Sequence, residues 1–283
     1  MQKARELGFP AEYAELIREK DGVTVARLHS GNDSAILKHF TPGTSPREIE
    51  NYRILSMLGV PSLRVLASGE DTIVIEDMAS EKCPFRLAEE KDMSDTDIAR
   101  RLAAWYRKLH DAGFAYVKAY GAAMYSETAF FTRENIANVR IKSGTSNLKA
   151  WELLDAHYDK IMQFMASVPM TLTYNDFYYT NMAVARDRTA AMMFDYNLLG
   201  KGHVYSDIRN VEYSLSPEAA AVFRKAYGDC DFSGEAALDA VISPIVTLHF
   251  AYSRDIFPDW ARAELDNIKT GYTEAVEALL TRL

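Results

Sequence analysis

The sequence of 283 residues predicts an α+β fold, in which a small antiparallel sheet is followed by a larger and mainly helical region. Two observations support this prediction. Up to Met78, short apolar segments have the lengths and the bounding turn residues of β-strands. Beyond Met78, apolar residues recur mostly at the three- and four-residue spacing of amphipathic helices. We therefore expect a bilobal protein, with one lobe spanning residues 1–78 and a helical lobe spanning residues 79–283.

Four strands are expected in the N-terminal lobe. Residues 23–28 and 34–40 have the pattern of two hairpin arms, and the glycine-containing segment 30–33 supplies the turn between them. Residues 65–69 and 72–76 are rich in branched apolar side chains, which favour strands.

One helix interrupts these strands. Ser45 can cap its first turn, Pro46 suits the first helical position, and Glu48 would complete a capping box by accepting a hydrogen bond from a backbone N–H. The helix is expected to run to about Leu58 and to end at Gly59.

Helices dominate the C-terminal lobe. The run Ser-Asp-Thr-Asp at residues 94–97 is typical of a helix N-terminus, and the apolar stripe after it predicts a helix that ends at His110, where the helix dipole favours a histidine. Further helices are predicted over residues 134–143, 147–167, 216–228, 234–252 and 258–281.

The composition narrows the class of protein. A net charge of −8 without a basic stripe argues against a nucleic-acid binder and suits a small cationic substrate. The two cysteines, Cys83 and Cys230, have no histidine cluster nearby, which argues against a zinc site or a disulfide scaffold. Because the chain lacks a signal-peptide pattern and any run of about 20 apolar residues, we expect a cytoplasmic protein without a membrane span.

The most informative residues are Asp176, Asn181 and Asp195. Asp176 and Asn181 lie in a loop between two β-prone segments, 170–174 and 182–185, and a turn and a third such segment then lead to Asp195. This order can bring three oxygen-bearing side chains to one point. Such a set suits phosphoryl transfer, because one carboxylate can address a substrate hydroxyl while the other two groups hold magnesium against nucleotide phosphates.

The pattern resembles that of the aminoglycoside phosphotransferase and choline kinase superfamily, whose fold is similar to that of protein kinases. The resemblance extends over about residues 22–215 and implies a kinase that uses ATP, or GTP, together with Mg²⁺. It implies that Asp176 is the catalytic residue, which accepts or orients the proton of the attacking hydroxyl. It also implies that Asn181 and Asp195 are the metal ligands.

The resemblance implies nucleotide contacts in the N-terminal lobe as well. Lys38 resembles the strand lysine that contacts the α- and β-phosphates, and Glu48 would pair with it. Glu50 is an alternative partner. We favour Glu48 because Tyr52 and Leu55 share its helical stripe, so that this face should turn inward.

Other matches and departures concern single positions. Glu76 and Met78 lie in a segment that resembles the hinge, where backbone groups meet the adenine edge. Asp207 resembles an aspartate that stands before a helix and braces the catalytic loop, and it can also be an ordinary helix N-cap, since the two roles are compatible. Tyr174 and Asn175 stand where the family usually has His and Gly, and no clear glycine-rich phosphate loop precedes the strand lysine.

These features imply transfer of the γ-phosphate to a hydroxyl of a small cationic acceptor, such as an aminoglycoside, another antibiotic, choline, ethanolamine or an amino sugar. A non-catalytic nucleotide-binding module on the same fold is the alternative, and a helical interaction protein is a third reading. Acceptor recognition is expected from residues 127–145 and 205–260, and the oligomeric state is left open. The candidate acidic contacts there are Asp207, Glu212, Asp255 and Asp259.

Overall fold

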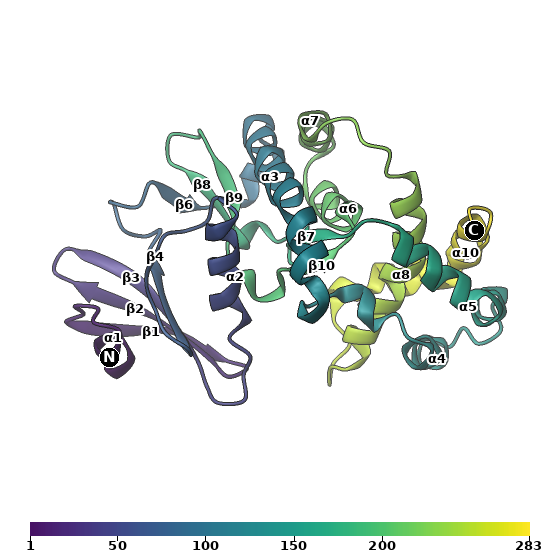
Figure 1. Ribbon diagram of the computed structural model, residues 1–283, viewed down its shortest axis with the longest axis horizontal. Coiled ribbons are helices and arrows are strands. Elements are labelled where there is room, and N and C mark those ends of the chain that lie inside the picture. Colours follow the sequence, from purple (N-terminus) through teal and green to yellow (C-terminus); the bar gives the residue numbers. More distant parts are fainter. The chain divides into compact units, whose positions relative to one another are not determined.

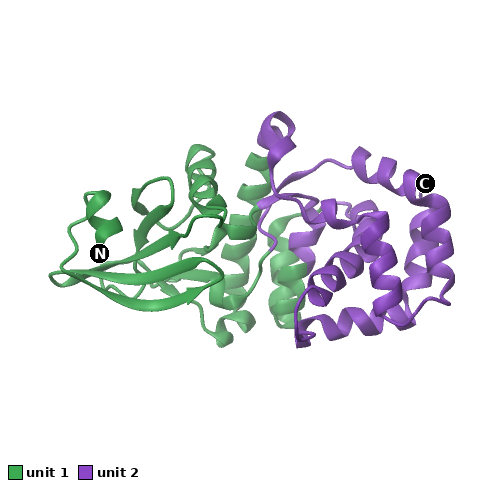
Figure 2. Cartoon of the chain, turned by 90° about the horizontal axis from the view of Figure 1, so that it is seen from below, with its two compact units in different colours: residues 1–113, 176–199, 210–229 green, residues 114–175, 200–209, 230–283 purple.

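The computed structural model describes residues 1–283 and confirms the α+β architecture (Figure 1). The chain divides into two compact units, shown in green and purple in Figure 2. Unit 1 comprises Met1–Gly113, Asp176–Leu199 and Asn210–Asp229, and unit 2 comprises Phe114–Asn175, Gly200–Arg209 and Cys230–Leu283. The boundary expected after residue 78 stays a prediction.

A five-stranded antiparallel sheet with the order β1-β2-β3-β5-β4 forms the first part of unit 1. Its strands are β1 (Tyr13–Lys20), β2 (Val23–Ser30), β3 (Asp33–Phe40), β4 (Val65–Ser68) and β5 (Thr72–Glu76). The four predicted strands are confirmed. The edge strand β1 was not predicted from the sequence, because charged residues crowd it and most of its side chains are exposed.

Alternation along β3 gives the sheet two different faces. Leu37 packs with Val74 and with Ala4 of the short helix α1 (Gln2–Glu6), so α1 covers one face. Lys38 and its register partner Ile73 on β5 belong to the opposite face. A cation is thereby placed in the middle of a sheet whose other face is apolar.

Helix α2 (Arg47–Met57) lies beside this sheet (Figure 1). Its end at the left-handed Gly59, with φ of 67°, agrees with the sequence. The capping box expected at its start is wrong: Pro46 takes the N-cap position and no side chain caps the first turn. Glu48 is instead fully buried and paired with Lys38, because a buried ammonium needs a counter-charge more than an exposed N–H needs an acceptor.

A second, three-stranded sheet also belongs to unit 1. It has the order β6-β8-β9, from β6 (Phe85–Leu87), β8 (Met182–Ala185) and β9 (Ala191–Met193). The predicted hairpin formed by β8 and β9 is confirmed, and its turn places Arg188 at a φ of 62°. Unit 1 also contains several helical elements: η1 (Glu90–Ser94), the part of α3 (Thr96–Tyr120) up to Gly113, η4 (Tyr179–Asn181), η5 (Tyr196–Leu198), the part of α6 (Val204–Ser214) from Asn210, and α7 (Pro217–Tyr227).

The helix expected to end at His110 is longer than predicted. α3 continues to Tyr120, so His110 lies inside the helix and is fully buried. Its Nδ1 is 2.8 Å from the Tyr227 hydroxyl. A hydrogen bond to another buried side chain, and not the helix dipole, accounts for this histidine.

Unit 2 is a helical assembly with one two-stranded ribbon, β7 (Thr171–Thr173) paired with β10 (Gly200–Gly202). Its core includes the fully buried side chains Trp151, Ile245 and Tyr272. The helix predicted over 258–281 is broken at Gly271 into two. The helical elements are the end of α3 from Phe114, η2 (Gly121–Ala123), η3 (Glu127–Phe130), α4 (Arg133–Lys142), α5 (Lys149–Ser167), the part of α6 up to Arg209, α8 (Ser233–Tyr252), η6 (Asp259–Ala261), α9 (Arg262–Thr270) and α10 (Tyr272–Leu280).

None of these helices is both long and apolar enough to cross a membrane.

Candidate active site

A short loop between β7 and β8 carries the first part of the site. Asn175 has a φ of 66°, a left-handed conformation that asparagine tolerates better than most residues, which explains why Asn can stand where Gly is usual. The backbone N–H groups of Tyr174 and Asn175 donate to the two carboxylate oxygens of Asp207, over 2.7 and 3.0 Å. Asp207 is buried and therefore fixes the start of the loop that leads to Asp176.

Asp207 lies within the first turn of α6, which begins at Val204. The reading of Asp207 as an N-cap is therefore wrong, and so is its expected place before the helix. Its carboxylate accepts hydrogen bonds from backbone N–H groups of the loop.

Asp176 is half-buried and forms hydrogen bonds with another site residue, Asn181. Asn181 donates through Nδ2 to the Asp176 carboxylate, over 3.1 Å, and to its backbone oxygen, over 3.3 Å. Burial and the negative charge of Asp195 raise the pKa of Asp176 to about 6, against the opposing effect of the Asn181 hydrogen bond. A carboxyl group with this pKa can exchange a proton near neutral pH.

Asp195 follows β9 and has a left-handed backbone, with φ of 63° and ψ of 70°. Non-glycine residues in this region often mark functional positions. Its Oδ1 accepts hydrogen bonds from Lys38 Nζ, over 2.9 Å, and from Asn197 Nδ2, over 2.7 Å. The charged side chains of Lys38 and Asp195 are thus already in contact.

Lys38 also contacts Glu48, with Nζ 2.7 Å from Oε1. The Lys38 and Glu48 side chains are 8% and 0% exposed, so the pair is shielded from solvent. Burial disfavours the ammonium, but the Glu48 and Asp195 carboxylates outweigh it and raise the pKa of Lys38. Glu50 is exposed and pairs with Arg53, so Glu48 is the glutamate that holds this lysine.

Glu76 ends β5 and Met78 follows it, and both make contacts within unit 1. Glu76 Oε1 accepts from the Arg64 backbone N–H, over 2.8 Å, and the Met78 carbonyl accepts from Arg186 Nη2, over 2.9 Å. The structure therefore places Glu76 at the end of β5 and Met78 just beyond it, and their adenine contacts stay a prediction.

The turn between β1 and β2 is too short to form a glycine-rich phosphate loop. It consists of Asp21 and Gly22, both with positive φ. Thr41 anchors it, since its backbone N–H and its hydroxyl donate to the Gly22 carbonyl over 2.9 and 3.0 Å. A Cβ on Gly22 would collide with the Thr44 hydroxyl, and its φ of 78° also favours glycine.

A comparison with protein families decides the identity. The model of the phosphotransferase enzyme family matches residues 18–241, a range that includes all the predicted catalytic, metal-binding and nucleotide-binding residues. The chain belongs to this family.

Solved structures similar to this chain include kinases and antibiotic phosphotransferases. The choline kinase of Streptococcus pneumoniae is 13% identical, with a TM-score of 0.62 over 99% of this chain and 97% of that one. A spectinomycin phosphotransferase in complex with ADP and spectinomycin is 11% identical, with a TM-score of 0.62 over 99% and 97%. The ethanolamine kinase of Plasmodium vivax is 12% identical, with a TM-score of 0.63 over 97% and 87%. These similarities establish the fold, and a comparison with curated proteins found no match.

The phosphotransferase has donors that fit a magnesium ion, although no three acidic, histidine or cysteine side chains converge on one point. The Asn181 amide nitrogen is used by Asp176, which leaves the amide oxygen available as a neutral ligand. Asp195 adds a charged oxygen. Two protein oxygens are enough for magnesium when phosphates and water supply the remaining ligands.

Sequence reasoning missed one residue that positions the site of the phosphotransferase. Asn51 on α2 is buried and donates through Nδ2 to the Tyr196 carbonyl, over 2.7 Å, and to the Leu199 carbonyl, over 3.3 Å. It holds the segment that follows Asp195. The sequence held one signal for this role, because Asn51 lies one helical turn after Glu48 and so shares its inward face.

Proposed function

We propose that this phosphotransferase transfers the γ-phosphate of ATP or GTP to a hydroxyl group of a small cationic acceptor. Two contacts within unit 1 carry the proposal: Lys38 with Asp195, and Asn181 with Asp176. The negative charge of Asp195 acts on Asp176 and links the two pairs. These four side chains supply a cation for phosphate oxygens, two metal ligands and one carboxylate with a pKa near neutrality.

Each residue has a role that follows from its surroundings. Lys38, held by Glu48, presents a fixed positive charge to the nucleotide phosphates. Asp195 and Asn181 would hold a magnesium ion, which when bound neutralises charge on the transferring phosphate. Asp176 orients the acceptor hydroxyl and takes its proton as the oxygen attacks phosphorus.

The cationic nature of the acceptor is supported by two lines. The net charge of −8 raises the local concentration of cations. Structures with the same fold include choline kinase, ethanolamine kinase and spectinomycin phosphotransferase. Of the acidic residues expected to contact the acceptor, Asp207, Glu212 and Asp259 already bind backbone N–H groups, Arg224 and Arg262 respectively. Asp255 remains a candidate.

The complete set of Lys38, Asp176 and Asp195 favours catalysis over the non-catalytic nucleotide-binding alternative. Mg·ATP should raise the melting temperature, because a ligand that binds only the folded state stabilises it. Aminoglycosides, choline, ethanolamine and amino sugars should then be screened for phosphate acceptance. Asp176→Ala should abolish transfer to the acceptor while the Mg·ATP shift persists. Full turnover by this variant would refute the role of Asp176.

A further inference from the structure

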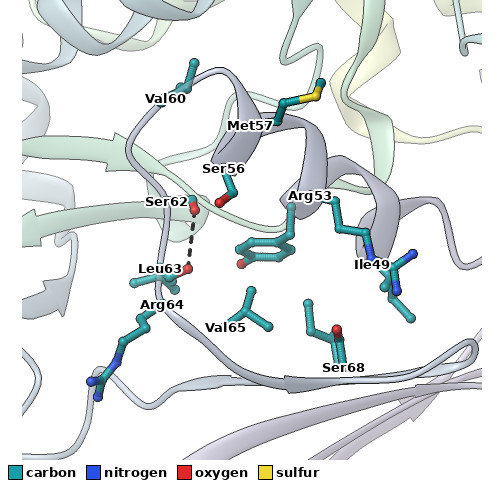
Figure 3. Close-up of a pocket in the computed structure, with 13 residues that line it drawn as sticks. Ile49, Arg53, Ser56, Met57, Val60, Ser62, Leu63, Arg64, Val65 and Ser68 are labelled. Atoms are coloured by element: carbon teal, nitrogen blue, oxygen red, sulfur yellow. Dashed lines mark hydrogen bonds between the residues drawn. The ribbon is translucent and has the colours of Figure 1, made fainter.

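A pocket of about 760 Å³ lies between α2 and the strands β4 and β5 of unit 1 (Figure 3). This volume is within the roughly 300–1,000 Å³ of small-molecule sites. The pocket is lined by 13 residues, and Lys38, Asp176, Asn181 and Asp195 are not among them. It is therefore separate from the proposed active site.

The floor of the pocket is apolar and its rim is open. Ile49, Leu63 and Ile73 on the floor are no more than 2% exposed, whereas Met57 and Val65 are 65% and 37% exposed. An apolar ligand body could displace water from this floor, which is favourable in proportion to the area covered.

The charges around the pocket are of one sign. Arg53 and Arg64 line it, and no acidic residue does, although the whole chain has a net charge of −8. The guanidinium of Arg64 makes no hydrogen bond or ion pair, and that of Arg53 contacts only the exposed Glu50, over 3.3 Å. Two cations with so little counter-charge favour an anionic ligand.

A buried polar group supplies an independent observation. Tyr52 lines the pocket and is 2% exposed, and its hydroxyl has no hydrogen-bond partner. Buried hydroxyl groups in folded proteins nearly always have a partner, so this one is available to a ligand. Two further hydroxyls line the pocket, Ser56 from α2 and Ser68 from β4, as Figure 3 shows.

We propose that this pocket binds a small amphiphilic anion, meaning an apolar body that carries a carboxylate, phosphate or sulfonate group. The apolar body lies on the floor formed by α2 and β5, and the anionic group lies at the rim beside Arg64, on the opposite side of the pocket from Arg53 (Figure 3). Because Ile73 is the register partner of Lys38 and Tyr52 lies one turn after Glu48, the ligand touches both elements that hold this ion pair.

Two fluorescent probes test the proposal. One is 8-anilino-1-naphthalenesulfonate, and the other is N-phenyl-1-naphthylamine, which has the same apolar body without the sulfonate. Both are titrated into protein saturated with Mg·ATP, so that the active site is closed to them. We expect the sulfonate to bind saturably. The neutral probe should bind about threefold to tenfold more weakly, because it lacks the partly solvated ionic contact with the arginine.

Variants locate the binding. Arg64→Ala should lower the affinity for the sulfonate by about threefold to tenfold and leave the affinity for the neutral probe unchanged. Arg18→Ala, which removes an exposed arginine of β1 outside the pocket, should change neither. Ser68→Phe places an aromatic side chain at an exposed strand position. It should fill the pocket and lower the affinity for both probes.

The proposal is overturned if the sulfonate does not bind the nucleotide-saturated protein, or if the two probes bind equally well. It is also overturned if Arg64→Ala behaves like Arg18→Ala. None of these measurements requires phosphotransfer, so failure of the proposed catalytic function would leave the outcome readable.

Discussion

Replacing Asp176 by asparagine should make the protein more stable while it abolishes phosphotransfer. The pKa of this carboxyl is raised from 3.8 to about 6 in the folded protein. At neutral pH the folded state therefore carries a carboxylate in a place that disfavours it, beside the negative charge of Asp195. Asparagine keeps the shape and removes the charge.

The size of the effect follows from the shift in pKa. A shift of about two units corresponds to about 3 kcal/mol at a pH above both values. The effect on stability is opposite in sign to that of a salt-bridged aspartate. Because the pKa is raised in the folded state, the folded protein binds more protons than the unfolded one. The Asp176 carboxylate therefore lowers the free energy of unfolding by the full amount above pH 6. This effect falls as the pH drops through 6 toward 3.8, to about half at pH 5.

The assay is urea denaturation of wild type and Asp176→Asn at pH 7.5 and pH 5, with a chelator present so that no metal ion offsets the carboxylate charge. The free energy of unfolding of the variant should exceed that of wild type by as much as about 3 kcal/mol at pH 7.5 and by about half as much at pH 5. Asp255→Asn, at an exposed position in unit 2, is the control and should show no such gain. A gain that is absent, or that does not change with pH, would refute the reasoning.

Three further substitutions test other parts of the site. Glu48→Gln should raise the dissociation constant for Mg·ATP about tenfold by releasing the strand lysine, as measured by calorimetry, whereas Glu50→Gln should not; equal effects would contradict the assigned pairing. Asp207→Asn should lower the free energy of unfolding by about 2 kcal/mol, because a backbone N–H of the catalytic loop loses its acceptor; an unchanged urea midpoint would argue against the brace. Gly22→Ala should cost about 1–2 kcal/mol more than Gly31→Ala, since both have positive φ but only the first would collide with a neighbour; equal losses would mean that the turn adjusts.

Much of the fold was predictable, because local patterns determine it. The hairpin around Gly31 and the helix that ends at Gly59 have strong turn and capping signals, and the structure has both. Strand β1 escaped prediction because it packs as an exposed edge, where apolar alternation is not required.

The site was predictable in its residue types and not in its contacts. Lys38, Asp176 and Asp195 could be selected from their positions in short motifs. The partners of Glu48 and the role of Asn51 could not be decided locally. The two competing readings of Glu48 differ only in whether its face of the helix is buried, and burial depends on segments more than 100 residues away.

The contact between Lys38 and Asp195 joins residues 157 positions apart in the sequence. At about 5–20 residues per second, a ribosome needs about 8–30 seconds to make the intervening chain. During that interval the first sheet and α2 can fold with Lys38 and Glu48 paired. The Asn51 amide, however, lacks the carbonyl groups of Tyr196 and Leu199 during that interval, and Tyr52 lacks the ring of Tyr196 that packs against it. The nascent N-terminal part is thus incomplete until residue 199 has left the ribosome, and this face of α2 stays uncovered for the same time.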